Sequence, residues 1–231
     1  MPRKCVEIAY VECINKMAGK APLFKRLLLI AFLGFQAHCC GSIPRGADPG
    51  TSPGDPDHNE TLYAVCEMRP SSTLLAGQPQ IHGQVLFMQT DPTKALKVMV
   101  NLQGLPHKDK QSRAIHIHEY GDLSDGCNAC GGHYNPLTVP HPHHPGDLGN
   151  FPSEHTRIRT LLDTPATLYG GRSVLGRSVV IHEKEDDMGL GGDTGSLLHG
   201  NAGRRLGCCV IGVSSSKYWN KTTESFGEEG N

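Results

Sequence analysis

The sequence predicts an antiparallel β-sandwich or barrel that carries two long loops. Glycine (28 residues) and proline (16) are plentiful while aromatic residues make up only 6%, which favours a loop-rich β protein over a helical bundle. Short apolar segments separated by Gly/Pro turns supply the strands. Two long stretches, 121–156 and 184–204, lack strand character, and loops of that length in a compact domain are usually functional or disordered. The expected strands are 61–68, 81–89, 95–102, 113–120, 157–162, 176–183 and 206–213.

The N-terminal region has the character of a targeting segment. Lys25 and Arg26 precede the apolar run 27–35, and small residues follow it, so residues 1–42 are expected to form a secretory signal region. Met17 is a possible start, and cleavage is expected between about 37 and 42. The apolar run is too short for a bilayer span. The alternative is that this run forms a buried helix of the domain.

The rest of the chain divides into three parts. Residues 43–60 are rich in Pro, Gly and Asp and predict a flexible leader. The domain is expected over 61–215, and the polar segment 216–231 predicts a disordered tail. A formal net charge of −1 gives no general electrostatic case for nucleic acid or for an anionic membrane.

Secretion permits disulfides and glycosylation. Signal cleavage leaves an odd set of cysteines, so one thiol is left over or pairs between chains. These cysteines are Cys66, Cys127, Cys130, Cys208 and Cys209. Asn59 and Asn220 begin N-x-T sequons in polar flanks and are glycosylation candidates.

The stretch 115–118 reads I-H-I-H. Alternate residues of a strand share a face, so Ile115 and Ile117 point one way while His116 and His118 point the other. The isoleucines fit a core face, and the paired imidazoles fit a metal chelate. Taken alone, two histidines on a strand are more often structural residues than ligands.

A second group of histidines lies in the proline-rich loop 133–147, which holds four histidines and an aspartate. Imidazole suits zinc and copper, and three such nitrogens with one carboxylate can complete a tetrahedral zinc site. A solvated loop with only adventitious metal affinity is the alternative. His182 lies on a further expected strand, and Arg204 and Arg205 precede the vicinal cysteines 208 and 209.

Five motifs in order carry a resemblance over residues 61–215: H-I-H-E-Y-G-D, G-G-H-Y-N-P-L, H-P-G-D-L-G-N, G-R-S-V-V-I-H-E-K and G-N-A-G-R-R-L-G-C-C-V-I-G. Together they are similar to the copper–zinc superoxide dismutases, and the signal, the vicinal cysteines and Cys66 are most similar to the secreted members. The resemblance implies a Greek-key β-sandwich or flattened barrel of about eight strands. It also implies an extracellular enzyme that converts superoxide anion to dioxygen and hydrogen peroxide, and a homo-oligomer, either a dimer or a tetramer.

The resemblance assigns one copper and one zinc per chain, with His133 bridging them. Copper is assigned to His116, His118, His133 and His182. Zinc is assigned to His133, His141, His144 and Asp147. Asp186 matches the carboxylate that orients one copper histidine and one zinc histidine, and Arg205 matches the arginine that receives the anion. His143 and Arg204 match no functional position and are expected to be solvated.

By the same resemblance, copper alternates between Cu(II) and Cu(I). His133 is expected to leave the reduced copper and take up a proton, so Arg205 and His133 are the expected catalytic residues. The resemblance pairs Cys127 with Cys208 and Cys66 with Cys209, which leaves Cys130 as a free thiol or a mixed disulfide.

The chain departs from the family pattern in three places. Gly132 replaces a proline before the bridging histidine, which loosens the loop. Leu198 and His199 replace a lysine and a threonine of the cytosolic relatives, so steering depends more on Arg205, and His199 is expected to add a pH-dependent charge. The tail has no basic cluster, which predicts weak heparin binding.

Two alternatives use the same scaffold. A non-catalytic secreted copper- and zinc-binding relative would keep the metal residues without the reaction, but the presence of Arg205 beside all six histidines argues against it. A copper chaperone would need an M-x-C-x-x-C module before the domain. The sequence has no such module, and its one C-x-x-C lies within the loop, at Cys127–Cys130.

Overall fold

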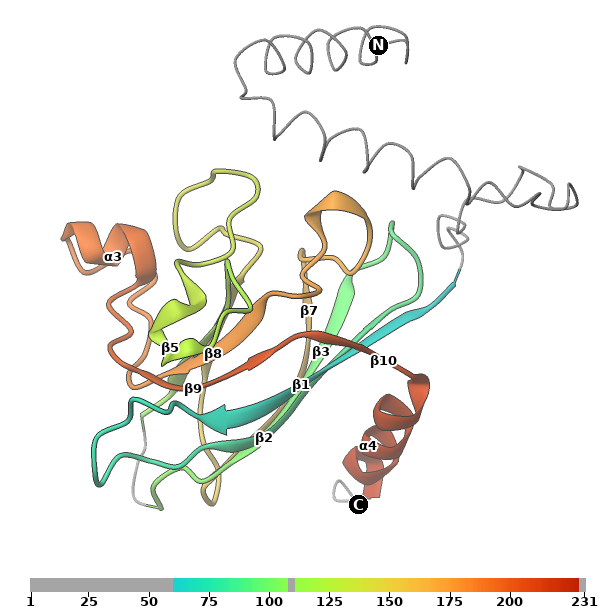
Figure 1. The fold of residues 1–231 in the computed structure, drawn as a ribbon, viewed down its shortest axis with the longest axis horizontal. Helices are drawn as coiled ribbons and strands as arrows, with labels where there is room; N and C mark the ends of the chain where they lie inside the picture. The colour runs from blue at the N-terminus through green and yellow to red at the C-terminus, as the bar shows by residue number, and fades with distance from the viewer. Residues whose placement is uncertain (1–59, 108–110, 229–231) are drawn as a thin grey trace, which may run out of the picture. The chain divides into compact units, whose positions relative to one another are not determined.

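The computed structural model describes residues 60–107 and 111–228, and within these ranges the chain is built mainly of antiparallel strands (Figure 1). The strands are β1 (Leu62–Pro70), β2 (His82–Gln89), β3 (Leu96–Gln103), β4 (Arg113–His118), β5 (Ser124–Cys127), β6 (Asp147–Phe151), β7 (Arg157–Thr164), β8 (Ser178–His182), β9 (Arg205–Val210) and β10 (Gly212–Ser214). The helices are α3 (Thr194–His199) and α4 (Ser216–Glu228), with 3₁₀ turns η2 (Asn128–Cys130) and η3 (Gly170–Arg172).

Eight strands form a nearly closed barrel in the order β6-β4-β8-β9-β1-β2-β3-β7, and β10 pairs with β1 beside this path. Strand β1 joins the two halves of the sheet, since Leu62–Met68 pair with β2 while Arg69 and Pro70 pair with β9. Strand β3 pairs with β7 in one half of the barrel, and the next strand, β4, pairs with β8 in the other half. The chain therefore crosses from one half to the other between β3 and β4. The predicted all-β, antiparallel sandwich or flattened barrel is confirmed.

The core lies between the two halves of the barrel and follows from the period-two alternation of the strands. Val85 and Phe87 of β2 point into it, as do Ile115 and Ile117 of β4, each with no exposed surface. Because Ile115 and Ile117 face the core, His116 and His118 are turned to the opposite face of β4, as the I-H-I-H pattern predicts.

All seven expected strands correspond to observed strands, but the long loops contain elements that the sequence did not predict. Stretch 121–156 holds β5, η2 and β6, and stretch 184–204 holds α3. The last expected strand, 206–213, is divided into β9 and β10 around Ile211. Strand β6 was missed because its sequence, D-L-G-N-F, is short and lacks an alternating apolar pattern. It is a strand because its backbone pairs with β4.

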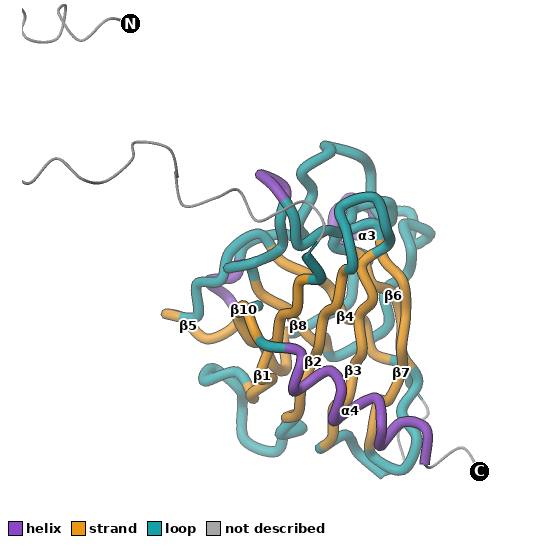
Figure 2. Tube along the Cα trace, turned by 90° about the vertical axis from the view of Figure 1, so that its right-hand side faces the viewer, coloured by secondary structure: helices purple, strands orange, loops and turns teal. Residues whose placement is uncertain are grey.

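The predicted disordered tail at 216–231 is wrong for most of its length, because Ser216–Glu228 form helix α4. Trp219 of α4 packs against Leu86 of β2 and Met99 of β3 on the outer face of the sheet, where Figure 2 shows the helix crossing the strands. The buried indole of Trp219 holds the helix against the sheet. The mainly polar composition of the segment gave no indication of this contact. Among the described residues, neither helix has the length or the apolar character needed to cross a bilayer.

The expected signal region and the leader lie outside the described residues, apart from Glu60, and so does the sequon residue Asn59. The second sequon residue, Asn220, lies on α4 with its side chain exposed.

Candidate metal centre

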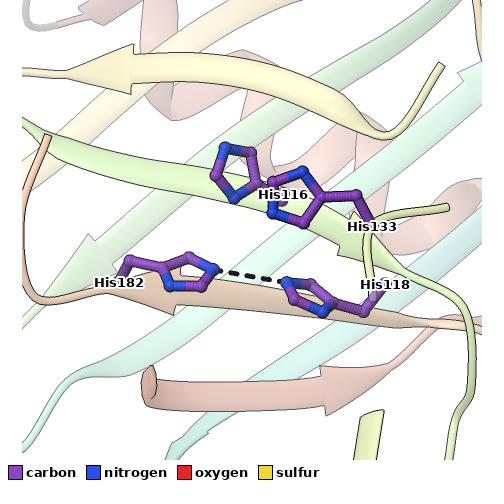
Figure 3. Close-up of side chains that lie close together, drawn as sticks. All are labelled: His116, His118, His133 and His182. Atoms are coloured by element: carbon purple, nitrogen blue, oxygen red, sulfur yellow. Dashed lines mark hydrogen bonds between the residues drawn. The ribbon is translucent and has the colours of Figure 1, made fainter. Parts of the chain in front are cut away.

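Two neighbouring strands present the first group of histidines. His116 and His118 come from β4 and His182 comes from the end of β8, which pairs with β4 along its length (Figure 3). Irregularities in strand register fall at Ile115/His116 in the β4–β6 pair and at Ile181/His182 in the β8–β9 pair. Such bulges re-aim side chains, and here each one lies at a histidine of the cluster. The second bulge also places Arg205 of β9 opposite His182.

His133 completes the first cluster from the long loop. It forms an isolated bridge with His118, and its ring centroid lies 3.9 Å from that of His116. One ring nitrogen from each of four histidines lies within 4.8 Å of the others, namely His116, His118, His133 and His182. Nε2 of His118 and Nε2 of His182 face each other at 3.2 Å, the contact drawn in Figure 3.

Two nitrogens of this cluster are buried and have no hydrogen-bond partner in the described part of the chain: Nδ1 of His116 and Nε2 of His133. A buried polar atom left unpaired costs roughly 1–3 kcal/mol, so such atoms call for a partner that the protein does not provide. A cation with imidazole ligands satisfies both nitrogens at once, so the donor set fits a metal such as copper.

The second cluster uses the other nitrogen of His133. Nδ1 of His133, His141 and His144 lie 2.7, 3.0 and 3.2 Å from the carboxylate oxygens of Asp147. Three imidazole nitrogens and one carboxylate again lie within 4.8 Å of one another. This is the donor set of a tetrahedral zinc site, and His133 belongs to both clusters through its two different nitrogens.

Asp186 connects the two clusters from behind. One carboxylate oxygen lies 2.9 Å from Nε2 of His116 and the other 2.8 Å from Nε2 of His141, and the Asp186 side chain is fully buried. These contacts fix both rings so that their Nδ1 atoms point into the clusters. Backbone carbonyls orient two further rings: Gly131 lies 3.0 Å from Nδ1 of His118, and Gly203 lies 3.4 Å from Nδ1 of His182.

Burial favours the neutral form of four of these histidines, which is the form that binds metal. Burial, followed by repulsion from neighbouring imidazoles, lowers the pKa of His116 and of His118 well below the ordinary value, and burial lowers the pKa of His182 to about 3. Burial also lowers the pKa of His144. Burial alone would raise the pKa of Asp147, but the hydrogen bond from His133 and the nearby imidazoles outweigh it and lower that pKa, so Asp147 is ionised.

Arg205 is held beside the first cluster by backbone oxygens. Its Nη1 donates to the carbonyls of Cys127 and Asn128 at 2.9 and 3.4 Å, and its Nη2 donates to Gly131 at 2.7 Å. The guanidinium lines a hollow of about 620 Å³ that also reaches His118, His133 and His182. Burial lowers the pKa of Arg205, but a guanidinium starts so basic that the residue remains cationic at physiological pH.

The residues that the sequence predicts to be solvated are so. His143 is exposed between two members of the second cluster, and Arg204 lies on the surface with its Nε 3.5 Å from Glu183.

Disulfides join Cys127 to Cys208 and Cys66 to Cys209, as the resemblance implies. Cys130 is free and buried in the same cluster as the Cys127–Cys208 bond. The first disulfide therefore fixes the segment whose carbonyls hold Arg205 to the strand β9 that carries Arg205.

Sequence reasoning missed two supports of Asp186. Asn150 exchanges two hydrogen bonds with the Asp186 backbone, each 2.8 Å long. Gly200 lies so close to the carboxylate that it has room for no side chain. Asn150 stands inside the quoted motif H-P-G-D-L-G-N, but an asparagine after a metal aspartate carries no signal that distinguishes it from an ordinary loop residue.

The fold and the shared histidine define an all-β protein with two adjoining candidate metal sites. Residues 81–211 match the family model of copper/zinc superoxide dismutase. The chain is 50% identical over 165 residues to extracellular superoxide dismutase [Cu-Zn] of Rattus norvegicus, which covers 71% of this chain and 68% of the rat protein. It is 47% identical over 174 residues to the protein of the same name from Homo sapiens, which covers 74% of this chain and 72% of the human protein.

A more distant relative covers the domain alone. Superoxide dismutase [Cu-Zn] of Cryptococcus neoformans is 38% identical over 150 residues, which is 62% of this chain and 96% of the fungal protein. The chain belongs to the copper/zinc superoxide dismutase family.

Proposed function

We propose that this protein is a secreted enzyme that converts two superoxide anions and two protons to dioxygen and hydrogen peroxide. The observation that carries this proposal is the sharing of His133 by two ligand clusters beside a cationic hollow. A protein that only stored metal would need the clusters but would have no use for a fixed guanidinium at an open approach to one of them.

The unpaired nitrogens support the assignment of the two metals. Copper would be held by His116, His118, His133 and His182, whose donors are all imidazoles without a thiolate. Zinc would be held by His133, His141, His144 and Asp147. Nδ1 of His133 lies 2.7 Å from Asp147, on the side of the second cluster, and Nε2 is buried with no partner in the described chain, so the two nitrogens of this ring would serve different metals.

Copper supplies the alternating one-electron chemistry when it is bound, and zinc fixes the loop that carries His133. The remaining work falls to the chain. Arg205 receives the anion, because three of its N–H groups are used by backbone carbonyls and two of its five donors remain. Nε2 of His133 has no other partner in the described chain, so it could carry a proton there and would place an acid beside the bound anion. Asp186 keeps the rings of His116 and His141 from turning away.

Superoxide decay in the presence of the secreted, copper- and zinc-loaded protein, measured over a range of ionic strength, tests the function. We expect fast decay that slows as salt rises, since electrostatic steering is screened. Arg205→Gln should lower the rate and remove most of the salt dependence while both metals stay bound. No acceleration with both metals confirmed would replace this proposal with the alternative of a non-catalytic secreted metal-binding relative.

The chain forms a homo-oligomer, a dimer or a tetramer. Exposed apolar side chains support this: Tyr120 is exposed, Val210 lies beside the neighbouring Gly121, and Tyr120 lines a shallow hollow with Leu175. A surface of this kind usually marks an interface. Sedimentation of Tyr120→Asp beside the unmodified protein tests it, and an unchanged mass would rule out this surface.

Secretion proceeds through the signal region 1–42, with cleavage between about 37 and 42, followed by the leader 43–60 and the catalytic domain from 61. N-terminal sequencing of the secreted protein tests this, and an intact Met1 or Met17 terminus would contradict it. Asn59 and Asn220 are candidate glycosylation sites; exposure of the Asn220 side chain supports the second. Heparin binding is weak, and elution from a heparin column only at high salt would contradict that.

A further inference from the structure

The hollow above Arg205 is much larger than a diatomic anion requires. Its volume of about 620 Å³ includes the space beside the imidazoles of both clusters and falls in the range of sites that enclose small organic molecules. Its only guanidinium belongs to Arg205, and no aspartate or glutamate appears among its described lining residues. The carboxylates of Asp147 and Asp186 lie behind the imidazoles with almost no exposed surface. The hollow therefore attracts one negative charge at its base and repels none at its mouth.

The mouth of the hollow has apolar walls from both long loops. Leu197 and Leu198 of α3 form one side, 59% and 61% exposed, and Val139 and Pro140 of the other loop also line it. Leucines this exposed beside a charged site are unusual for a surface whose ligand is a small hydrated ion.

Helix α3 is anchored so that its leucines stay in this position. Asp193 accepts a hydrogen bond from the backbone of Ser196 at the helix start, and Ser196 is completely buried with its hydroxyl on Asp187. Asn201 donates to both Asp187 and Asp193, at 2.9 and 3.0 Å. The leucines cannot turn inward, because Ser196 and its hydrogen bonds occupy the inner face of this short helix.

We propose that the hollow binds alkyl monocarboxylates, with the carboxylate on Arg205 and the alkyl chain against Leu197 and Leu198. This rests on the proposed role of Arg205 as the anion-binding residue. The base offers one guanidinium with two free donors, which suits a single carboxylate, and the walls offer apolar contact, which suits a chain of several methylenes.

The test is calorimetric titration of the copper- and zinc-loaded protein with acetate, butanoate, hexanoate and octanoate, at one pH and one ionic strength. We expect the dissociation constant to fall by about two- to fourfold for each added methylene, as for partial to full burial of that group. Inhibition of superoxide decay by the same four anions should follow the same order.

Three variants separate the two halves of the site. Leu197→Ser with Leu198→Ser should flatten the dependence on chain length. Leu190→Ser is the matched control: Leu190 lies on the same loop, is 86% exposed and does not line the hollow, so the dependence should persist. Arg205→Gln should weaken all four anions by a similar factor.

Chain-length-independent binding in the unmodified protein would overturn the proposal, as would a dependence that survives the double leucine change. A fall in oligomer mass on the double change, measured by sedimentation, would also overturn it, because the leucines would then be covered by another copy. Superoxide decay without any carboxylate tests the proposed function separately. A fast decay with flat binding would leave the function standing and remove only this inference.

Discussion

Gly200 and the carboxylate of Asp186 lie so close together that a side chain on Gly200 would occupy the place of Oδ1. Gly200 ends helix α3 in the left-handed conformation, with φ of +63°, so glycine is needed there for its backbone as well. The same carboxylate holds His116 and His141. One glycine of the second loop thus positions a residue of each ligand cluster through Asp186.

Gly200→Ala should displace Asp186 and weaken retention of both metals by about ten- to a hundredfold, the usual loss when a residue that orients a metal ligand is removed. Gly192→Ala is the matched control. It lies in the same loop with φ of +78° and has open space around it, so it carries a similar backbone cost without the collision. Metal content after dialysis against a chelator measures the difference. Equal losses in both variants would mean that backbone strain alone is responsible.

Cys130 should be present as one thiol per chain that reacts only after unfolding. Its side chain is buried against the Cys127–Cys208 disulfide, and burial raises the pKa of the thiol further above neutral pH, so little thiolate exists there. Titration with a thiol reagent should count about one group in denaturant without reductant and almost none in the native protein over the same time. No thiol in denatured monomer, or rapid native reaction, would contradict this.

The sequence predicts features that depend on neighbouring residues better than features that depend on contacts between distant parts of the chain. The alternation of I-H-I-H fixes a strand with two faces, so the orientations of His116 and His118 are predictable from local pattern alone. The pairing of two clusters through His133 is not, because it depends on a loop returning to β4 by a single bridge at His118. The family resemblance supplied that assignment. Gly200 carried no local signal at all, since its constraint comes from a carboxylate fourteen residues earlier.

Helix α4 is a feature that the composition of its own segment failed to predict. Its residues are mostly polar, which predicts disorder, yet Trp219 is only 8% exposed and packs against Leu86 and Met99. The order of this segment depends on one large side chain. The composition of the whole segment is dominated by its polar residues and does not reveal that contribution.

Trp219→Ala should therefore destabilise the domain by about 3 kcal/mol, near the lower end for the loss of a buried aromatic, because α4 lies at the edge of the structure. Tyr218→Ala is the matched control, since the neighbouring Tyr218 is 46% exposed on the same helix, and its cost should stay within about 0.5 kcal/mol. Chemical denaturation measures both. Equal effects would show that α4 does not depend on the indole contact.

The two disulfides should differ in what their loss does to activity. Removing either pair by Cys→Ser changes should cost roughly 2–5 kcal/mol of stability, because each closes a long loop, with sequence separations of 81 and 143 residues. Of the four bonded cysteines, only Cys127 accepts a hydrogen bond from Arg205, through its backbone carbonyl at 2.9 Å.

The Cys127→Ser, Cys208→Ser protein should therefore lose more activity per bound copper than the Cys66→Ser, Cys209→Ser protein. Superoxide decay normalised to metal content, at a temperature where both variants are folded, makes the comparison. Equal activity in the two variants would show that the Arg205 position does not depend on the first disulfide.

Acid should destabilise the metal-free protein over a window set by its buried histidines. Burial lowers the pKa of His182 to about 3 and lowers the pKa of His116 and His118 as well, whereas in the unfolded chain histidine titrates near 6.5. Between these values the unfolded chain binds more protons than the folded one, so the free energy of unfolding rises with pH through this window and levels above about pH 7. Melting temperatures of the metal-free protein from pH 8 to pH 4 should fall only below pH 7. His143→Gln, which changes an exposed histidine, should leave that profile unaltered, and a melting temperature independent of pH would mean that the cluster opens to water once its metals are gone.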